Sequence, residues 1–274
     1  MQPFRPGVSA PKTMSKSALW FTFHRGQLLV EQKHEDITVY TAAPGLHGFS
    51  PIFSQYIGNY NGADIYAAEL PESAVLPGTL HFIKLRALFG KIDREMFSLA
   101  ARAVQIIQWN RDHKFCGRCG TEMVIRDTEL AKSCPACRFI SFPRLSPAVI
   151  MSIIREDEIL LARSARFPKG MYSTLAGFVE PGEKLEETVI REVREEVNVE
   201  VCDIKYAGSQ PWPFPHSLMI GFTTRYAGGD IEVDNDEIED AQWFSIDNLP
   251  VLPTRMSIAH HLIELFIKSV QKTR

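Results

Sequence analysis

Residues 177–199 read GFVEPGEKLEETVIREVREEVNV, a glycine-rich loop followed by a strongly charged helix, and they constrain the chain more than any other segment. Apolar residues that recur every three or four positions cover one arc of a helical wheel. That arc consists of Leu185, Val189, Ile190, Val193 and Val197. Glu192, Glu195 and Glu196 cover the neighbouring arc. The three acids are therefore expected at the edge of the buried face of a helix over residues 183–197.

Three acids at this spacing repel one another, and each like-charge pair four residues apart opposes the helix by about 0.2–0.5 kcal/mol. Divalent cations would explain the cluster, and hard oxygen ligands favour Mg²⁺ or Mn²⁺ bridging to phosphate oxygens. The alternative is a solvated charged face with ion pairs such as Glu187–Arg191 and Arg191–Glu195. Because that alternative leaves the glycine-rich loop unexplained, the sequence favours a metal site.

Four of the five cysteines form two C-x-x-C pairs, Cys116–Cys119 and Cys134–Cys137, with 14 residues between them. Each pair bends a short turn so that two thiolates face one point, and two pairs supply the four sulfurs of a tetrahedral zinc site. We predict one Zn²⁺ per chain with a structural role, because protein ligands fill every position. A redox pair is the alternative, which two pairs at ribbon spacing disfavour. Cys202 lies in an apolar stretch and is expected in the core.

The overall composition is that of an ordinary globular protein, with 274 residues, 45% apolar and 23% charged residues, and a net charge of −3. This balance argues against binding of nucleic acid by bulk positive charge, although a small nucleotide substrate is compatible with it. Apolar runs stay short of the roughly 18 residues of a membrane span, so no membrane partner is expected. An odd number of cysteines in a chain of this size indicates a reducing compartment, and we predict a cytoplasmic protein.

The N-terminal half divides into a leader and a strand-rich part. Residues 1–17 contain Pro3, Pro6 and Pro11 and are predicted to form a flexible leader. Residues 18–112 alternate strand-like runs with turn signals such as Asn61-Gly62, and they end in a connecting helix expected over residues 97–109. This part contains no catalytic motif, so a scaffold or dimerisation domain is the expected role.

The C-terminal half consists of the ribbon, residues 113–142, and a mixed part, residues 143–274. In the mixed part, strands are expected at residues 148–154, 159–162, 199–201, 218–222 and 231–233, and helices at 183–197 and 257–270. Mixed strands with helices on both sides predict an α/β sandwich.

The segment SQPWPFPHS at residues 209–217 follows the charged helix. Three prolines at alternate positions predict a stiff extended segment that holds Trp212 and Phe214 in place. Aromatic faces suit a nicotinamide or adenine ring. The alternative is an aromatic turn that plugs the core.

The spacing within residues 177–199 resembles the Nudix box, G-x5-E-x7-R-E-U-x-E-E-x-G-U, in which U is apolar. The matching positions are Gly177, Glu183, Arg191, Glu192, Val193, Glu195, Glu196 and Val199. One position departs, because Asn198 stands where the box has its second glycine. Glycine there would end the helix in a left-handed conformation, and asparagine is the next-best residue for that conformation, so we expect little loss of function.

The box, the four-cysteine ribbon and the SQPWPFPxS motif together are similar to the zinc-ribbon NADH pyrophosphatases of the Nudix hydrolases, and they occur in that family's order from about Leu85 to the C-terminus. The resemblance implies a C-terminal Nudix α/β/α sandwich that uses Mg²⁺ or Mn²⁺ to hydrolyse NAD(H) to nicotinamide mononucleotide and AMP. Some members also remove NAD caps from the 5′ end of RNA. Members are homodimers in which the motif tryptophan reaches the partner's active site, which implies shared active sites here.

Two rival functions stay open at this point. One is a Nudix hydrolase of another nucleotide, such as ADP-ribose or a dinucleoside polyphosphate. The other is a nucleic-acid-binding regulatory module with a degenerate box, which the intact glutamate set and the weakly charged ribbon disfavour.

The resemblance also implies roles for individual residues. The catalytic residues would be Glu183, Arg191, Glu192, Glu195 and Glu196, with Arg191 orienting a carboxylate and Glu183 supporting the loop. The ligands of the divalent metal would be Glu192, Glu195, Glu196, Glu237 and the carbonyl of Ala176. The substrate contacts would be Gln210, Pro211, Trp212, Pro213, Phe214, Pro215, His216, Ser217, Phe178, Arg86, Glu129, Phe142 and Ala259. The family commonly has tyrosine where this chain has Phe142, so a hydroxyl contact is missing there.

Overall fold

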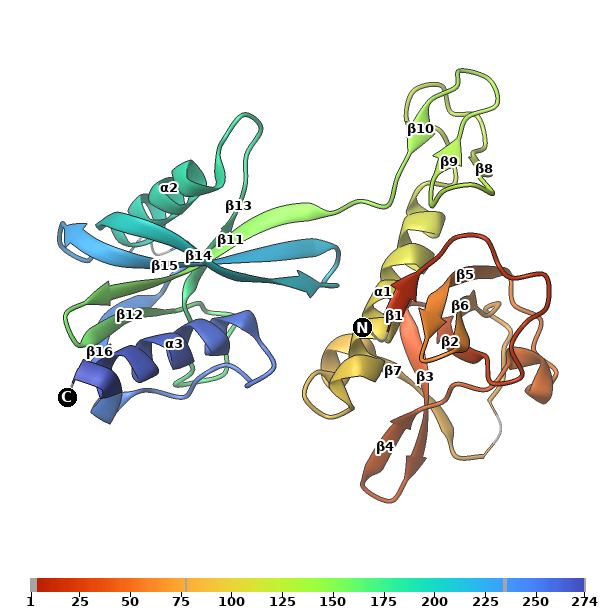
Figure 1. Ribbon diagram of the computed structural model, residues 1–274, viewed down its shortest axis with the longest axis horizontal. Helices are drawn as coiled ribbons and strands as arrows, with labels where there is room; N and C mark the ends of the chain where they lie inside the picture. The colour runs from red at the N-terminus through yellow and green to blue at the C-terminus, as the bar shows by residue number, and fades with distance from the viewer. Residues whose placement is uncertain (1–3, 77, 234–235, 274) are drawn as a thin grey trace. The chain divides into compact units, whose positions relative to one another are not determined.

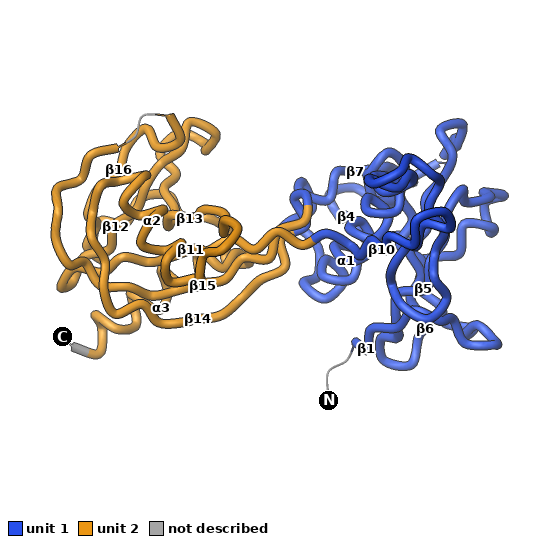
Figure 2. Tube along the Cα trace, turned by 90° about the horizontal axis from the view of Figure 1, so that it is seen from above, with its two compact units in different colours: residues 1–144, 213–215 blue, residues 145–212, 216–274 orange. Residues whose placement is uncertain are grey.

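The computed structural model describes residues 4–76, 78–233 and 236–273 (Figure 1). The chain divides into two compact units (Figure 2). Unit 1 comprises residues 1–144 and 213–215, and unit 2 comprises residues 145–212 and 216–274. Within the described ranges, no helix has the length and apolar character needed to span a bilayer.

Unit 1 contains a mixed sheet in the order β1-β5-β6-β2-β3-β4, with β7 beside β3. Its strands are β1 (Phe4–Pro6), β2 (Leu19–His24), β3 (Gln27–Lys33), β4 (Asp36–Val39), β5 (Phe53–Tyr60), β6 (Ala63–Glu69) and β7 (Leu80–Lys84). The hairpin predicted at Asn61-Gly62 is confirmed, because both residues adopt positive φ (50° and 86°) and turn β5 into β6. The short helix η1 (Pro44–His47) lies between β4 and β5.

The N-terminal leader is partly ordered by the sheet. Strand β1 pairs with β5 and places Arg5 opposite Asn59. The close approach of β1 to β5 depends on Gly58, since a Cβ there would lie 2.3 Å from the carbonyl oxygen of Arg5. Residues 4–6 are therefore an edge strand rather than part of a flexible leader, and the described residues 7–17 contain no helix or strand.

A long helix and the ribbon complete unit 1. The short helix η2 (Leu85–Leu88) precedes α1 (Arg94–Asp112), which contains the helix predicted over residues 97–109. The side chain of Asp93 accepts hydrogen bonds from two backbone N–H groups of the first turn and caps α1. The ribbon has the strands β8 (Val124–Ile125), β9 (Lys132–Ser133) and β10 (Ile140–Ser141), in the order β10-β9-β8.

Unit 2 is built on a mixed sheet in the order β14-β15-β11-β12-β16, with β13 beside β11. Its elements are β11 (Ser146–Arg155), β12 (Glu158–Arg163), β13 (Leu175–Phe178), α2 (Leu185–Val197), β14 (Glu200–Trp212), β15 (Ser217–Gly228), β16 (Asp240–Ser245), η3 (Ile246–Asn248) and α3 (Ile258–Thr273). Val149, Met151 and Ile153 of β11 pack with α2, whereas Ile150 packs with the start of α3. The two helices therefore cover opposite faces (Figure 1), which confirms the predicted α/β sandwich.

Helix α2 ends as the sequence predicts. Asn198 adopts the left-handed conformation, with φ 56° and ψ 29°, and its N–H donates to the carbonyl of Arg194 at 3.0 Å. Asparagine thus supplies the helix end that glycine supplies in the Nudix box.

Three expectations for unit 2 are wrong. Strand β14 extends far beyond the predicted strand at residues 199–201, because it pairs with most of β15. Residues 231–233 form no helix or strand, and the edge strand β16 follows later. Cys202 is exposed rather than in the core. A bulge between Cys202 and Lys205, with Asp203 at φ 55°, interrupts the alternation of buried and exposed side chains there.

Candidate active site

The four ribbon cysteines converge on one point. Their Sγ atoms all lie within 4.8 Å of one another, with 3.6 Å between Cys116 and Cys137 and 3.4 Å between Cys119 and Cys134. Four sulfurs bound to zinc at about 2.3 Å would lie about 3.8 Å apart, so the cluster fits one zinc ion. The geometry of the four cysteines supports the predicted structural zinc site.

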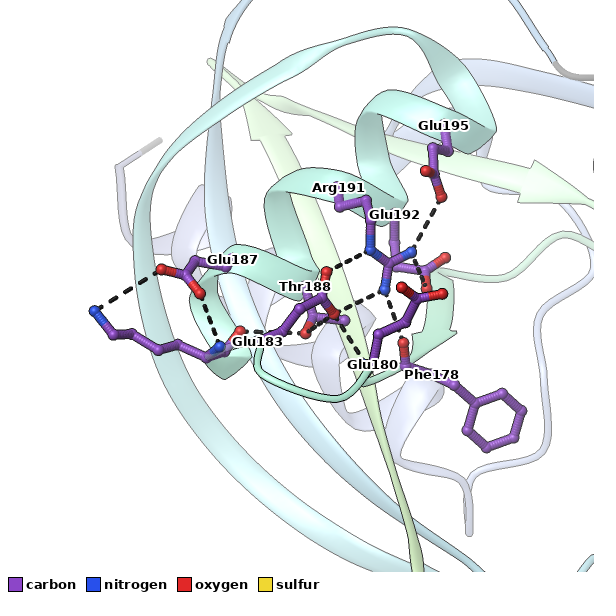
Figure 3. Close-up of polar contacts among 9 residues, drawn as sticks. Phe178, Glu180, Glu183, Glu187, Thr188, Arg191, Glu192 and Glu195 are labelled. Atoms are coloured by element: carbon purple, nitrogen blue, oxygen red, sulfur yellow. Dashed lines mark hydrogen bonds and ion pairs between the residues drawn. The ribbon is translucent and has the colours of Figure 1, made fainter.

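Arg191 is the centre of the loop and helix segment (Figure 3). Its Nε and Nη2 donate to the two carboxylate oxygens of Glu183 at 2.6 and 3.0 Å. Its Nη1 donates to Glu192 at 2.8 Å and to Glu195 at 3.0 Å. Nη2 also donates to the carbonyl oxygen of Phe178 at 2.9 Å. One guanidinium therefore ties the glycine-rich loop to two of the expected metal ligands.

Glu183 is held by several donors. It accepts hydrogen bonds from the backbone N–H of Glu180 at 3.0 Å and from the Thr188 hydroxyl at 2.8 Å, besides those from Arg191. Hydrogen bonding from Arg191 is the main cause that lowers the pKa of Glu183 to about 2. An ionised carboxylate with this many partners fits the expected role of supporting the loop. Sequence reasoning missed Thr188, because the charge pattern that marks the other residues carries no signal for a hydroxyl.

The solvated-face alternative predicted an ion pair between Glu187 and Arg191. Glu187 instead accepts from the backbone N–H of Lys184 at 2.9 Å and lies 3.8 Å from its Nζ. The predicted pair between Arg191 and Glu195 is present, but as one contact of a guanidinium that also binds the loop (Figure 3). The charged arc of α2 is therefore an organised site rather than a set of independent surface pairs.

The expected metal ligands differ in burial. The carboxylate of Glu192 lies over Gly177, where a Cβ would fall 1.8 Å from Glu192 Cδ. The Glu192 side chain is 13% exposed and Glu196 is 6% exposed, whereas the Glu195 side chain is 61% exposed. Burial is the main cause that raises the pKa of Glu192, and the charges of Glu195 and Glu237 raise it further. Carboxylates brought together out of water favour a bound cation.

The donor set fits a hard divalent cation. Carboxylates and backbone carbonyls are ligands that Mg²⁺ and Mn²⁺ take. The carbonyl of Ala176 directly precedes Gly177, over which the Glu192 carboxylate lies. In the described part of the chain, only the cysteines bring three or more ligand atoms within 4.8 Å of one another. The glutamate oxygens are therefore spread more widely than the zinc ligands.

The SQPWPFPHS motif forms the connection between β14 and β15 rather than one extended segment. The ladder ends where Trp212 pairs with Ser217, so the residues between them must reverse the chain, and they form a turn with a cis Phe214–Pro215 peptide. The carbonyl of His216 accepts from the backbone N–H of Ser146 at 2.9 Å and anchors the turn to the start of β11. Trp212 is half-buried, which does not fit a core plug.

Three expected substrate contacts lie in unit 1, together with residues 213–215. The guanidinium of Arg86, expected to contact phosphate, lies 4.4 Å from the centroid of the Phe214 ring, a cation–π contact. Glu129 pairs with Arg126 at 2.9 Å, and Phe142 is 56% exposed.

Two further expected contacts lie in unit 2 with the glutamates. Phe178 is 57% exposed, and its ring points away from the guanidinium of Arg191 (Figure 3). Ala259 is buried in the first turn of α3 and packs in the same apolar cluster as Ala176. The fold thus brings the start of α3 to the strand that ends at the glycine-rich loop.

Family models match almost the whole described chain. Residues 17–109 match an NADH pyrophosphatase-like rudimentary NUDIX domain, residues 111–142 match the NADH pyrophosphatase zinc ribbon domain, and residues 144–266 match the NUDIX domain. The chain belongs to the NADH pyrophosphatase family of Nudix hydrolases. It is therefore a Nudix pyrophosphohydrolase, and the alternative of a regulatory module with a degenerate box is set aside.

Relatives of this family are similar along most of their length. The chain is 50% identical over 218 residues to the NAD-capped RNA hydrolase NudC of Pseudomonas aeruginosa, covering 79% of this chain and 78% of the relative. It is 51% identical over 218 residues to the NAD-capped RNA hydrolase NudC of Stutzerimonas stutzeri, covering 79% of each. A crystal structure of a NUDIX hydrolase from Nitrosomonas europaea aligns with a TM-score of 0.49 at 25% identity, over 57% of this chain and 90% of that one.

Proposed function

We propose that the protein hydrolyses the pyrophosphate bond of NAD(H) to nicotinamide mononucleotide and AMP, and that it removes NAD caps from RNA by the same cut. Relatives that are 50% and 51% identical over 218 aligned residues are named NAD-capped RNA hydrolases. The observation that carries the chemistry is the Glu192 carboxylate, held over Gly177 by Arg191. This arrangement supports a fixed set of carboxylate oxygen ligands, which a metal-dependent pyrophosphatase requires.

The proposed mechanism assigns a task to Arg191, to Glu183 and to the carboxylates around them. Mg²⁺ or Mn²⁺ would stabilise charge on the phosphates and lower the pKa of the attacking water. The residues proposed to bind the cation are Ala176, Glu192, Glu195, Glu196 and Glu237. Arg191 keeps the carboxylates of Glu192 and Glu195 in place, and Glu183 fixes Arg191. A glutamate of this set takes a proton from water, the water oxygen bonds to phosphorus, and the bridging P–O bond breaks.

The proposed contact that selects NAD(H) is Trp212. If its ring stacks on the nicotinamide, Trp212→Ala should weaken binding of NADH by about 1–3 kcal/mol, the range for stacking of a base on an aromatic ring. Metal binding should not change, because indole offers no hard ligand. ADP-ribose has the same pyrophosphate without nicotinamide, so its turnover should change far less. Equal losses on both substrates with a lower melting temperature would instead identify Trp212 as a packing residue.

We also propose a cytoplasmic homodimer with shared active sites. In this arrangement, residues 18–112 serve as scaffold or dimerisation domain, residues 113–142 as a structural ribbon, and residues 143–274 as the catalytic domain. Mixing Trp212→Ala with Glu196→Gln protein, with proven subunit exchange, should restore activity, since one site would combine an intact Trp212 with an intact Glu196. No restoration would show that Trp212 acts within its own chain.

The test of the proposed function is a product assay with NADH, NAD⁺, ADP-ribose and NAD-capped RNA, each in Mg²⁺ and in Mn²⁺. Release of nicotinamide mononucleotide from NADH or from capped RNA, at higher kcat/KM than cleavage of ADP-ribose, is expected. Preferential cleavage of ADP-ribose would overturn the proposed substrate while keeping the Nudix chemistry.

A further inference from the structure

The side chain of Gln210, expected as a substrate contact, is engaged with the backbone at the start of α3. Its Nε2 donates to the carbonyl oxygen of Met256 at 2.7 Å, and its Oε1 accepts from the backbone N–H of Ile258 at 2.8 Å. The first N–H groups of a helix have no partner within the helix, so a side-chain acceptor completes the first turn. Ser257 serves the same turn, because its hydroxyl accepts from the N–H of His260 at 3.2 Å.

These two hydrogen bonds link parts of the site that are distant in sequence. Gln210 lies two residues before Trp212 on β14, so both side chains lie on the same face of the strand. Ala259 follows Ile258, which donates to Gln210, and it packs in one apolar cluster with Ala176 of β13. The neighbouring strand approaches the helix closely, since a Cβ on Gly221 would lie 2.9 Å from Ile258 Cδ1. The start of α3 is thus fitted between the motif strand and the strand that leads to the glycine-rich loop.

We propose that Gln210 is a positioning residue that clamps the aromatic motif strand to the first turn of α3, and so fixes Trp212 for its contact with the nucleotide. This proposal rests on the proposed function for the identity of the nucleotide. One amide N–H and the amide oxygen are committed to the backbone at hydrogen-bonding distance. A carboxamide donates through its nitrogen and accepts through its oxygen at any pH, which explains a glutamine in this place. Loss of the clamp loosens the turn and misplaces the contacts without touching the glutamates.

The test compares the full-length wild type with Gln210→Leu, Gln210→Glu and the matched control Gln242→Leu, which changes an exposed glutamine on β16. In Gln210→Leu, amide hydrogen exchange over residues 256–261 should accelerate about tenfold or more, as expected for local opening. Its kcat/KM for NADH should fall by about 10- to 100-fold, mainly through KM, while the Kd for Mn²⁺ stays within about twofold. Gln242→Leu should match the wild type in every measurement.

Gln210→Glu separates a clamp from simple packing. Glutamate accepts from the N–H of Ile258 at any pH, but it donates to the carbonyl of Met256 only when it is protonated. The activity of this variant relative to the wild type should therefore rise as the pH falls from about 7.5 to 5.5, which a packing role would not cause. If Gln210→Leu does not fold, the exchange and kinetic comparisons are made with Gln210→Glu.

Two outcomes would overturn the clamp: unchanged exchange over residues 256–261, or kinetic constants within twofold of the wild type. A loss confined to nicotinamide-containing substrates with unchanged exchange would make Gln210 a direct substrate contact. A wild type that fails to cleave NADH overturns the proposed function instead. The exchange measurement does not depend on the substrate, and the kinetic comparison then uses the nucleotide that the wild type does cleave.

Discussion

Gly177→Ala tests whether the Glu192 carboxylate must lie directly over residue 177. The added Cβ would lie 1.8 Å from Glu192 Cδ and 2.0 and 2.2 Å from its two oxygens. Ordinary van der Waals contact begins at 3.4 Å, so the carboxylate must retreat by about 1.6 Å, the difference between 3.4 and 1.8 Å. Such a shift also breaks the 2.8 Å hydrogen bond from Arg191. Because Gly177 lies in strand β13, alanine is compatible with its backbone, and the effect comes from the collision alone.

Stability and activity should respond very differently to this change. The group that moves is the end of a flexible side chain, so we expect a destabilisation of about 1 kcal/mol, at the low end for overpacking. That corresponds to a fall in Tm of roughly 2–4 °C for a chain of this size class. A proposed metal ligand displaced by more than 1 Å should lower kcat/KM for NADH by about 10² or more and weaken binding of Mn²⁺.

The assay measures hydrolysis of NADH, titration of Mn²⁺ and thermal unfolding on the same preparations. Gly45→Ala is the matched control, because nothing lies within 4 Å of a Cβ at that position. The control should retain wild-type activity. Activity of Gly177→Ala within about threefold of the wild type would refute the reasoning. Catalysis would then not depend on the position of the Glu192 carboxylate over Gly177.

Three further outcomes follow from the two sites. Metal analysis should find one tightly held Zn²⁺ per chain, and Cys119→Ser should destabilise the fold because zinc binding is coupled to folding; stable, active protein with less than about half an equivalent would contradict this. Glu196→Gln should lower turnover by about 10² or more with the fold intact, and near-normal turnover would remove Glu196 from the metal site. The pKa of Glu183 falls from 4.5 to about 2 on folding, so its ion pair with Arg191 stabilises the protein above pH 4.5 and is lost as the pH falls towards 2. The difference in Tm between the wild type and Glu183→Gln should therefore be full at pH 7 and shrink between pH 4.5 and 2, and a difference independent of pH would argue against it.

The contacts that sequence reasoning could not supply are those between distant segments. The distance between Gly177 and Glu192 depends on how α2 packs on β13, and the contact of Gln210 with Met256 and Ile258 spans more than forty residues. Both depend on how a helix packs against the sheet, which the spacing of residues along the chain does not encode. Cys202 is a comparable case, since its exposure follows from a bulge in the pairing of β14 with β15.

The sequence by itself determined the features that depend on neighbours along the chain. Two C-x-x-C turns define the zinc ligands because each turn aims two sulfurs at one point, and the three- and four-residue spacing of the glutamates puts them on one arc of α2. Asn198 ends that helix because its own conformational preference suits a left-handed residue. Only the tertiary structure decided which partners the charges take. Arg191 could bind along its helix or reach the loop, and packing of α2 against the sheet brings the carboxylate of Glu183 and the carbonyl of Phe178 within its reach.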